Sequence, residues 1–111
     1  MLLHIISTAG WAAARSAGSI SPVGEDFVHC SDRGVVHVTA GRFFHGQSGL
    51  LLLVIDPKLL DVPVRWEAVA DSPLWFPHVY GQIPVAAVLE VHDFPCEPDG
   101  SFVLPEAVAV L

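Results

Sequence analysis

The sequence predicts a small α+β domain in which two helices near the N-terminus pack on a split, mostly antiparallel sheet. Three observations lead to this prediction. Two helix-like segments fall within the first 44 residues, short strand-like segments make up most of the rest, and no repeat or linker divides the 111 residues. Because helices and strands do not alternate along the chain, the pattern favours α+β over a doubly wound parallel sheet. We expect one domain over residues 1–111.

The first predicted strand and helix have clear boundaries. Residues 2–6 are short and apolar with β-branched residues at the end, which is typical of a buried strand. Ser7 or Thr8 can then cap a helix that runs to Ala17. Gly18 stands where a helix commonly ends in the left-handed conformation. A helix of about this extent is therefore expected directly after the first strand.

A second strand and helix are predicted further along the N-terminal half. Residues 19–26 are rich in Ser, Pro and Gly and predict a loop, and residues 27–31 suit a short strand. Ser31 or Asp32 can cap a second helix from about Arg33 to Phe44. Apolar residues recur in it at spacings of four and three, as one buried face requires: these are Val36, Ala40 and Phe43.

The second half of the chain is dominated by predicted strands. The run Leu50–Ile55 is apolar at every position, which indicates a central strand buried on both faces. Residues 64–68 alternate between apolar and charged side chains, as in a strand with one wet face. The remaining expected elements are a helical turn over residues 57–60, strands over 76–80 and 87–94, and an edge strand over 102–104.

Composition narrows the classes of function. The formal net charge is −7, with 12 acidic and 5 basic residues, and such a surface repels nucleic acid phosphates. The longest apolar run is far shorter than the roughly 20 residues of a membrane helix. The N-terminus lacks the basic region of a secretory signal, and Cys30 and Cys96 show no close pairing. We therefore expect a cytoplasmic protein with reduced thiols and no nucleic acid or membrane partner.

Three of the six histidines lie in predicted strands: His4, His29 and His78. Strand alternation places His29 on one face with Phe27 and Ser31, and it groups His78 with Phe76 and Tyr80. An imidazole beside a hydroxyl group and an aromatic ring suits a pocket for a ribose or a flat heterocycle. The alternative is that these histidines are hydrogen-bonded to the backbone within the sheet.

Glu67 also has two interpretations. It shares a strand face with Arg65, so the two can form a surface ion pair. It can also act as an acid/base or sugar-orienting carboxylate beside the histidines.

The other reactive residues are weaker candidates. His37 and His92 are interpreted as ordinary residues, and His45 lies in a glycine-flanked loop that could hold an anion. A Cys30–His29 pair is rejected because adjacent strand residues point to opposite faces. A zinc site of three histidines lacks a close-spaced ligand pair, so no metal is expected.

Six strings follow one another along the chain: His4–Ile6, Glu25–Ser31, Arg42–Gln47, Leu50–Asp56, Val64–Glu67 and Phe76–Gly81. Together and in this order, they resemble the bacterial family catalogued as domain of unknown function 952. The family in turn is distantly similar to the ADP-ribosyltransferase superfamily, including the RNA 2′-phosphotransferases. That resemblance implies a small split-sheet fold that binds NAD-type ligands in a cleft. It implies that His4 contacts a ribose, that His29 and Ser31 form the second position, and that His78, Tyr80 or Glu67 fills the third.

Two hypotheses of different classes follow. The first is an ADP-ribosyltransferase-like enzyme that takes NAD or a related nucleotide as substrate, with no tightly bound cofactor. Its catalytic residues are His29, His78 and Glu67, and its ligand-binding residues are His4, Ser31 and Tyr80. The second is a non-catalytic module that binds a small nucleotide-like ligand or a partner through the same pocket. An RNA phosphotransferase is disfavoured, because a phosphorylated RNA end requires cationic side chains that are scarce here.

Overall fold

Three antiparallel strands form the sheet at the centre of the computed structural model, which describes residues 1–69 and 72–110. The strands are β1 (Leu2–Ser7), β4 (Leu50–Ile55) and β8 (Val88–Asp93), in the order β1-β4-β8. β4 lies in the middle, and all of its residues except Leu51 are buried. Its apolar character on both faces therefore predicted its central position correctly.

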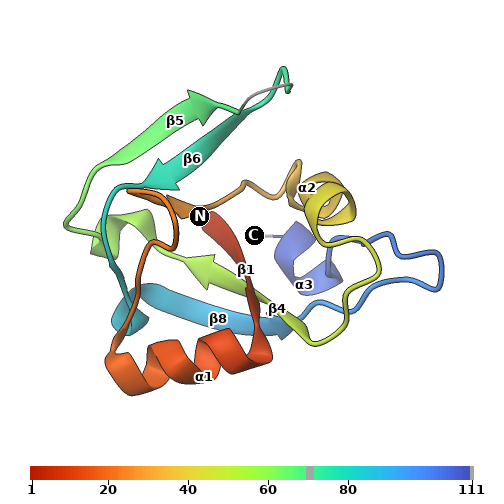
Figure 1. Cartoon of the computed structure of the whole chain (residues 1–111), viewed down its shortest axis with the longest axis horizontal. Coiled ribbons are helices and arrows are strands. Elements are labelled where there is room, and N and C mark those ends of the chain that lie inside the picture. Colours follow the sequence, from red (N-terminus) through yellow and green to blue (C-terminus); the bar gives the residue numbers. More distant parts are fainter. Residues whose placement is uncertain (70–71, 111) are drawn as a thin grey trace.

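A second antiparallel sheet has the order β3-β6-β5. It consists of β3 (Val28–His29), β5 (Val64–Ala68) and β6 (Trp75–Val79), and β5 and β6 form a hairpin that projects from the rest of the chain (Figure 1). Backbone hydrogen bonds between Leu3 and Ser31 connect it to β1. A third pair joins β2 (Ser19–Ile20) to β7 (Ile83–Pro84), so part of the predicted loop over residues 19–26 is a strand.

Helix α1 (Thr8–Ala17) has the two ends that were predicted. The Ser7 hydroxyl accepts a hydrogen bond from the Gly10 amide at 2.9 Å. Gly18 follows the helix with a φ of 90°, a left-handed conformation in which glycine has no Cβ to clash. Local capping chemistry thus sets both boundaries of α1.

Helix α2 (Val36–Phe43) begins later than was predicted. The Asp32 carboxylate accepts a hydrogen bond from the Gly34 amide, so it holds a turn and not a helix end. Val36 and Ala40 are buried as expected, whereas Phe43 is 54% exposed and its placement in the buried face was wrong. Phe43 is the last residue of the helix, and it lines a cavity together with Phe76.

The C-terminal segment also differs from the prediction. No strand forms over the described residues 102–104, although Phe102 is buried, and helix α3 (Glu106–Ala109) follows Pro105. Short 3₁₀-helices form at η1 (Pro57–Leu59) and η2 (Val85–Ala87).

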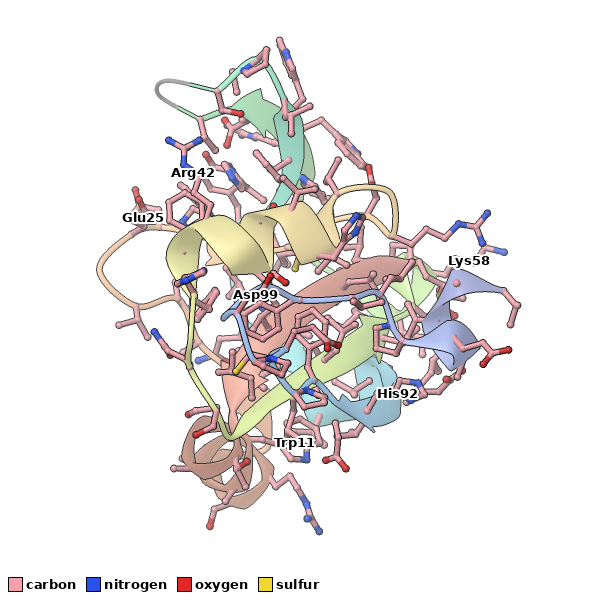
Figure 2. The ribbon with its side chains drawn as sticks, turned by 90° about the vertical axis from the view of Figure 1, so that its right-hand side faces the viewer. Trp11, Glu25, Arg42, Lys58, His92 and Asp99 are labelled. Atoms are coloured by element: carbon pink, nitrogen blue, oxygen red, sulfur yellow. The ribbon has the colours of Figure 1, made fainter. Side chains whose placement is uncertain are left out.

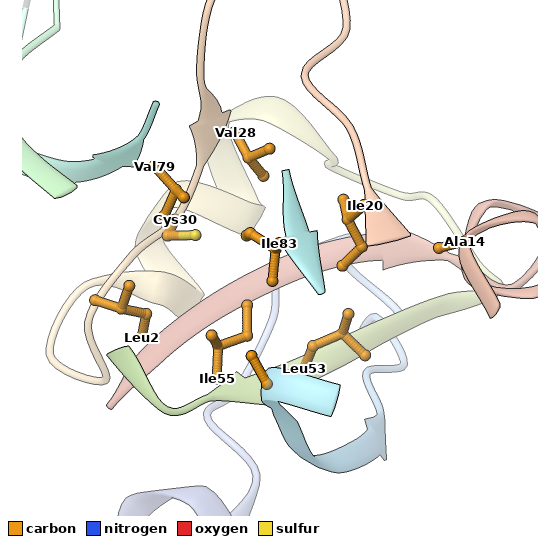
Figure 3. Packing of buried hydrophobic residues seen from close by; sticks show 10 residues of the cluster. Leu2, Ala14, Ile20, Val28, Cys30, Leu53, Ile55, Val79 and Ile83 are labelled. Carbon is orange, nitrogen blue, oxygen red and sulfur yellow. The ribbon is translucent and has the colours of Figure 1, made fainter. Parts of the chain in front are cut away.

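Two hydrophobic clusters cover the opposite faces of the β1-β4-β8 sheet. The first contains Leu2, Leu53 and Ile55 together with Ala14 of α1 (Figure 3). The second contains Leu3, Leu52 and Val54 from the other face, together with residues of α2 and α3. Alternate residues of β1 and β4 therefore enter different clusters. The chain is a small α+β domain with antiparallel sheets, and the described residues contain three α-helices. The simpler arrangement of two N-terminal helices on a split sheet is not confirmed.

None of the helices in residues 1–69 and 72–110 has the length and apolar character needed to cross a bilayer.

Candidate functional site

A cleft of about 570 Å³ opens between β1, α1 and the segment from β2 to β3. Its walls are mainly apolar, and its polar side chains come from serine, threonine and histidine. Among the described residues that line it, no Lys, Arg, Asp or Glu occurs. The volume falls within the usual range of small-molecule sites, roughly 300–1,000 Å³. The polar lining residues are His4, Ser19, Ser21, His29, Ser31 and Thr39.

His4 is held in one tautomer by the backbone of β3. Its Nδ1 lies 2.6 Å from the carbonyl oxygen of His29, and because a carbonyl only accepts, Nδ1 carries the proton. Burial lowers the pKa of His4, and the hydrogen bond to His29 opposes that effect only in part. The ring is therefore neutral at pH 7, and its Nε2 is left as an acceptor for a hydrogen bond.

His29 and Ser31 lie at the junction of this cleft with a smaller cavity of about 250 Å³. The His29 side chain is 57% exposed, and its Nε2 lies 2.5 Å from Oε2 of Glu25. Ser31 is buried and is fixed by its two backbone hydrogen bonds to Leu3, at 2.7 and 2.8 Å. Thr39 of α2 also lines both cavities. This junction therefore presents an imidazole and two hydroxyl groups to both spaces.

Glu67, His78 and Tyr80, which we call the Glu67 cluster, form a separate network on the β5–β6 hairpin. Oε1 of Glu67 accepts hydrogen bonds from Nδ1 of His78 at 2.8 Å and from the Tyr80 hydroxyl at 2.5 Å. The hydrogen bond from Tyr80, followed by that from His78, lowers the pKa of the Glu67 carboxyl. The hydrogen bond to Glu67 in turn raises the pKa of Tyr80. The carboxylate is therefore ionised and the phenol protonated at neutral pH.

His78 has an unusual position within the cluster. It is 2% exposed, and its Nε2 is buried without a hydrogen-bond partner among the described residues. The aromatic ring of Phe27 stacks on the His78 ring, with centroids 4.0 Å apart and an interplanar angle of 15°. His78 is thus ordered by Glu67 on one nitrogen and covered by Phe27 on its face.

Phe27 and His29 lie between the cleft and the Glu67 cluster. His29 pairs with His78 across β3 and β6, and their ring centroids are 5.0 Å apart. Phe27 and His29 line the cleft, whereas the three residues of the Glu67 cluster line neither cavity. The structure therefore places His4, His29 and Ser31 in the cleft, and it places Glu67, His78 and Tyr80 behind Phe27.

The family model described as "Protein of unknown function (DUF952)" matches residues 5–91. The chain belongs to this family. Two crystal structures of protein CC0527 from Caulobacter crescentus, one of the protein and one of a double mutant of it, are similar to this chain with TM-scores of 0.86 and sequence identities of 29% and 28%. Each match covers 97% of this chain and 97% of the other. A solution NMR structure of CC0527 is similar with a TM-score of 0.82 and 29% identity, over 99% of this chain and 97% of that one. None of the curated proteins matches.

In this DUF952 chain, Glu67 does not form the surface ion pair with Arg65 that was the alternative interpretation. Its carboxylate binds His78 and Tyr80, and the Arg65 guanidinium lies over the Tyr80 ring, 4.8 Å from its centroid.

The remaining reactive residues lie outside both networks or are inert. Cys30 is buried, and burial raises the pKa of its thiol to about 12, which agrees with the rejection of a Cys–His pair. The His45 ring packs on Gly100, where a Cβ would lie 2.6 Å from its Nε2. His92 binds Glu90 on β8, and Figure 2 shows His92 on the opposite side of the molecule from Glu25. No group of three or more His, Cys, Asp and Glu in residues 1–69 and 72–110 is arranged to hold a metal ion.

Two residues with contacts at the site were not singled out from the sequence: Glu25 and Thr39. Strand alternation did place Phe27 beside His29, but it did not predict that Phe27 stacks on His78. The Glu25–His29 contact spans four residues of a non-helical segment, where spacing carries no signal. Thr39 reaches the junction because α2 packs there, which only the tertiary structure reveals.

Proposed function

We propose that this DUF952 protein is an ADP-ribosyltransferase-like enzyme that binds NAD or a related ribosyl nucleotide in the His-lined cleft. The observation that carries the proposal is the meeting of His4, His29 and Ser31 in one cleft of suitable volume. These are the residues to which the resemblance assigns the ribose contact, at His4, and the second position, at His29 and Ser31. The aromatic rings of Phe27 and Phe44 also line the cleft and offer faces on which a flat base can stack.

The cleft residues bind the sugar and assist cleavage of its bond to nicotinamide. The neutral His4 accepts a hydrogen bond from a ribose hydroxyl at Nε2, and Ser31 orients the same sugar. The C–N bond to nicotinamide breaks, the electron pair leaves with neutral nicotinamide, and the ribose acquires oxocarbenium character. His29 takes the proton of the attacking hydroxyl or water as the new C–O bond forms.

In this proposal the Glu67 cluster supports His29 from behind. The ionised Glu67 holds His78 in one tautomer, and the edge-on contact of His78 with His29 fixes the orientation of the His29 ring. The negative charge of the Glu67 carboxylate, which lies behind Phe27, favours the positive charge that develops on the ribose in the transition state.

The second candidate is a non-catalytic module that binds a nucleotide-like ligand without turnover. A specific observation favours it. Glu67 is occupied by Tyr80 and His78 outside the cleft, and no described cleft residue supplies a free carboxylate or a cation for a diphosphate. Such a protein would bind a ligand and form no product.

Calorimetric titration with NAD, ADP-ribose and adenosine tests binding. We expect saturable binding of at least one of them, weakened about tenfold or more by Ser31→Ala or His4→Ala, because each removes a hydrogen bond to the sugar. His92→Ala is the matched control, because its ring lies on β8, away from the cleft. If none of the three compounds binds, the assignment of this cleft as the ligand site is wrong.

Release of nicotinamide from NAD, followed by chromatography, separates the two candidates. The enzyme hypothesis expects release that His29→Ala abolishes while ligand binding persists. Binding without nicotinamide release above the His29→Ala background would favour the non-catalytic module.

A further inference from the structure

Strand β5 has one unpaired edge. It is the last strand in the order β3-β6-β5, and no other segment of residues 1–69 and 72–110 pairs with it. Figure 1 shows β5 at the outer margin of the molecule. Free edges of this kind are templates for pairing with another chain.

The backbone groups on that edge can be identified from the hydrogen bonds around β6. The Tyr80 amide donates to the carbonyl of Pro63, and the Cys30 amide donates to the carbonyl of Pro77 on the other side of β6. In an antiparallel ladder the N–H and C=O of one residue point to the same side, and this side alternates along the strand. Arg65 and Glu67 therefore pair with β6, while the N–H and C=O groups of Val64, Trp66 and Ala68 point outward.

The side chains at this edge are apolar on one face and charged on the other. Trp66 is 49% exposed, and Trp75, on the neighbouring strand and the same face, is 61% exposed. Arg65 and Glu67 lie on the opposite face, on either side of Trp66. The edge therefore combines free backbone groups, an exposed aromatic side chain and two opposite charges placed symmetrically about Trp66.

We propose that β5 pairs with β5 of a second copy of this chain, antiparallel and about a twofold axis at Trp66. In this register the Arg65 side chain of each copy faces Glu67 of the partner subunit, and the two Trp66 rings lie directly across from each other. Opposite charges and aromatic pairs at directly facing positions both stabilise antiparallel strands. The result is one continuous sheet with strand order β3-β6-β5 in each copy, joined at β5.

The charge pattern selects this register over its neighbours. Moving the twofold axis to residue 65 brings the two Arg65 side chains together, and moving it to residue 67 brings the two Glu67 side chains together. Like charges directly opposite each other destabilise a sheet. Charged residues on an edge strand usually disfavour pairing with an uncharged strand. In this register, however, Arg65 and Glu67 of one copy face residues of opposite charge on the second copy.

The pairing also brings a cation to the Glu67 cluster. Both hydrogen bonds to Glu67 use Oε1, and the Glu67 side chain is 35% exposed. Oε2 accepts no hydrogen bond from the described residues, so it is available to the partner subunit's Arg65. The second copy therefore contributes a residue to the carboxylate that holds His78.

Sedimentation of the intact chain over a range of concentrations tests the assembly. Two five-residue strands bury a limited area, so we expect a reversible equilibrium in which the mass rises from one chain to two with concentration. Arg65→Glu should shift the sample to single chains, because it places two acids opposite each other. Arg65→Lys should retain the dimer. A mass of one chain at every concentration, or a dimer that Arg65→Glu leaves intact, would overturn the proposal.

Cross-linking tests the register. Positions 65 and 67 face each other as a non-hydrogen-bonded pair, whose Cα separation of about 4.5 Å suits a disulfide. Mixed Arg65→Cys and Glu67→Cys chains should form a disulfide-linked dimer on mild oxidation, while one Arg65–Glu67 pair remains. Arg65→Cys chains alone, or Glu67→Cys chains alone, should not form this disulfide. If either variant alone is linked as much as the mixture, the proposed register is wrong.

A second pair of variants leaves the Glu67 cluster intact, in case Glu67→Cys does not fold. Trp66→Cys should link across the twofold axis, and the more exposed Trp75→Cys should not. Linkage of Trp75→Cys at the same rate as Trp66→Cys would also overturn the proposal.

Discussion

His29 and His78 face each other across β3 and β6, and each has a glutamate within hydrogen-bond distance, yet their surroundings differ. The His29 side chain is 57% exposed beside Glu25, and it lines the cleft. The His78 side chain is 3% exposed, is covered by Phe27 and is bound by Glu67. The protein thus has one His–Glu pair that is exposed to water, His29 with Glu25, and one whose histidine is buried, His78 with Glu67.

The difference teaches how this protein can keep one histidine accessible. Ion pairs exposed to water contribute little to stability and leave the side chain free to bind something else. A buried histidine that is hydrogen-bonded to its partner keeps a fixed ring orientation, because it cannot exchange that hydrogen bond for one with water. We therefore interpret His78 as a positioning residue and His29 as the residue that meets a ligand.

The largest expected effect is on stability. His78→Ala should destabilise the protein by about 2 to 4 kcal/mol, because it leaves a cavity beneath Phe27 and removes the donor that binds Glu67. His29→Ala should change stability by less than about 0.5 kcal/mol, because its side chain is mostly in water. Urea unfolding of both variants measures the difference. An equal loss of unfolding free energy in the two variants would contradict the difference in their surroundings.

The next effect is a change in the pH dependence of stability. The folded-state pKa of Glu67 is lowered, so its ionised form contributes stability above the unfolded pKa of about 4.3 and loses it as the pH falls through the folded pKa. The pKa of Tyr80 is raised, so its protonated form contributes stability below about 10 and loses it as the pH rises through the folded pKa.

Glu67→Gln removes the titrating carboxyl of Glu67 and, with it, the charged acceptor that raises the pKa of Tyr80. We expect the stability of the natural protein minus that of the variant to have a plateau near neutral pH and to fall on both sides. The pKa of His4 is also lowered, which destabilises the fold as the pH drops below about 6.5, but this loss is common to both proteins and cancels. Parallel curves from urea unfolding at each pH would contradict the assignment.

The smallest effect concerns the neighbour of His29 in the chain. Cys30 points into the hydrophobic cluster, and with a pKa of about 12 it has only roughly 10⁻⁴ of its thiol ionised at pH 8. One thiol per chain, that of the half-buried Cys96, should therefore react with a thiol reagent in the native protein, and both should react in denaturant. Rapid reaction of Cys30 in the native protein would show that the β3 segment opens.

Elements with strong local signals were predictable from the sequence. Ser7 and Gly18 bound α1 because their capping interactions involve only neighbouring residues. Leu50–Ile55 could be placed at the centre because a run that is apolar on both faces needs cover on both. The β2–β7 pair and α3 could not be predicted, because their short segments are held by distant parts of the chain.

The candidate site was predictable in its residue types and less so in its arrangement. Alternation grouped His78 with Tyr80, and both bind Glu67 as hydrogen-bond donors. Alternation along a strand does not tell which side chain covers which, so the stacking of Phe27 between His78 and the cleft did not follow from the sequence.

The sequence by itself determined that the chain is α+β, that β4 is buried on both faces, and that histidines, hydroxyls and one glutamate gather on a few strands. These properties follow from residue chemistry and from periods of two and 3.6 residues, which are local. Only the tertiary structure decided that His4, His29 and Ser31 share a cleft while Glu67, His78 and Tyr80 form a network behind Phe27. That division depends on the register of β3, β5 and β6, which is set by contacts between residues far apart in the chain.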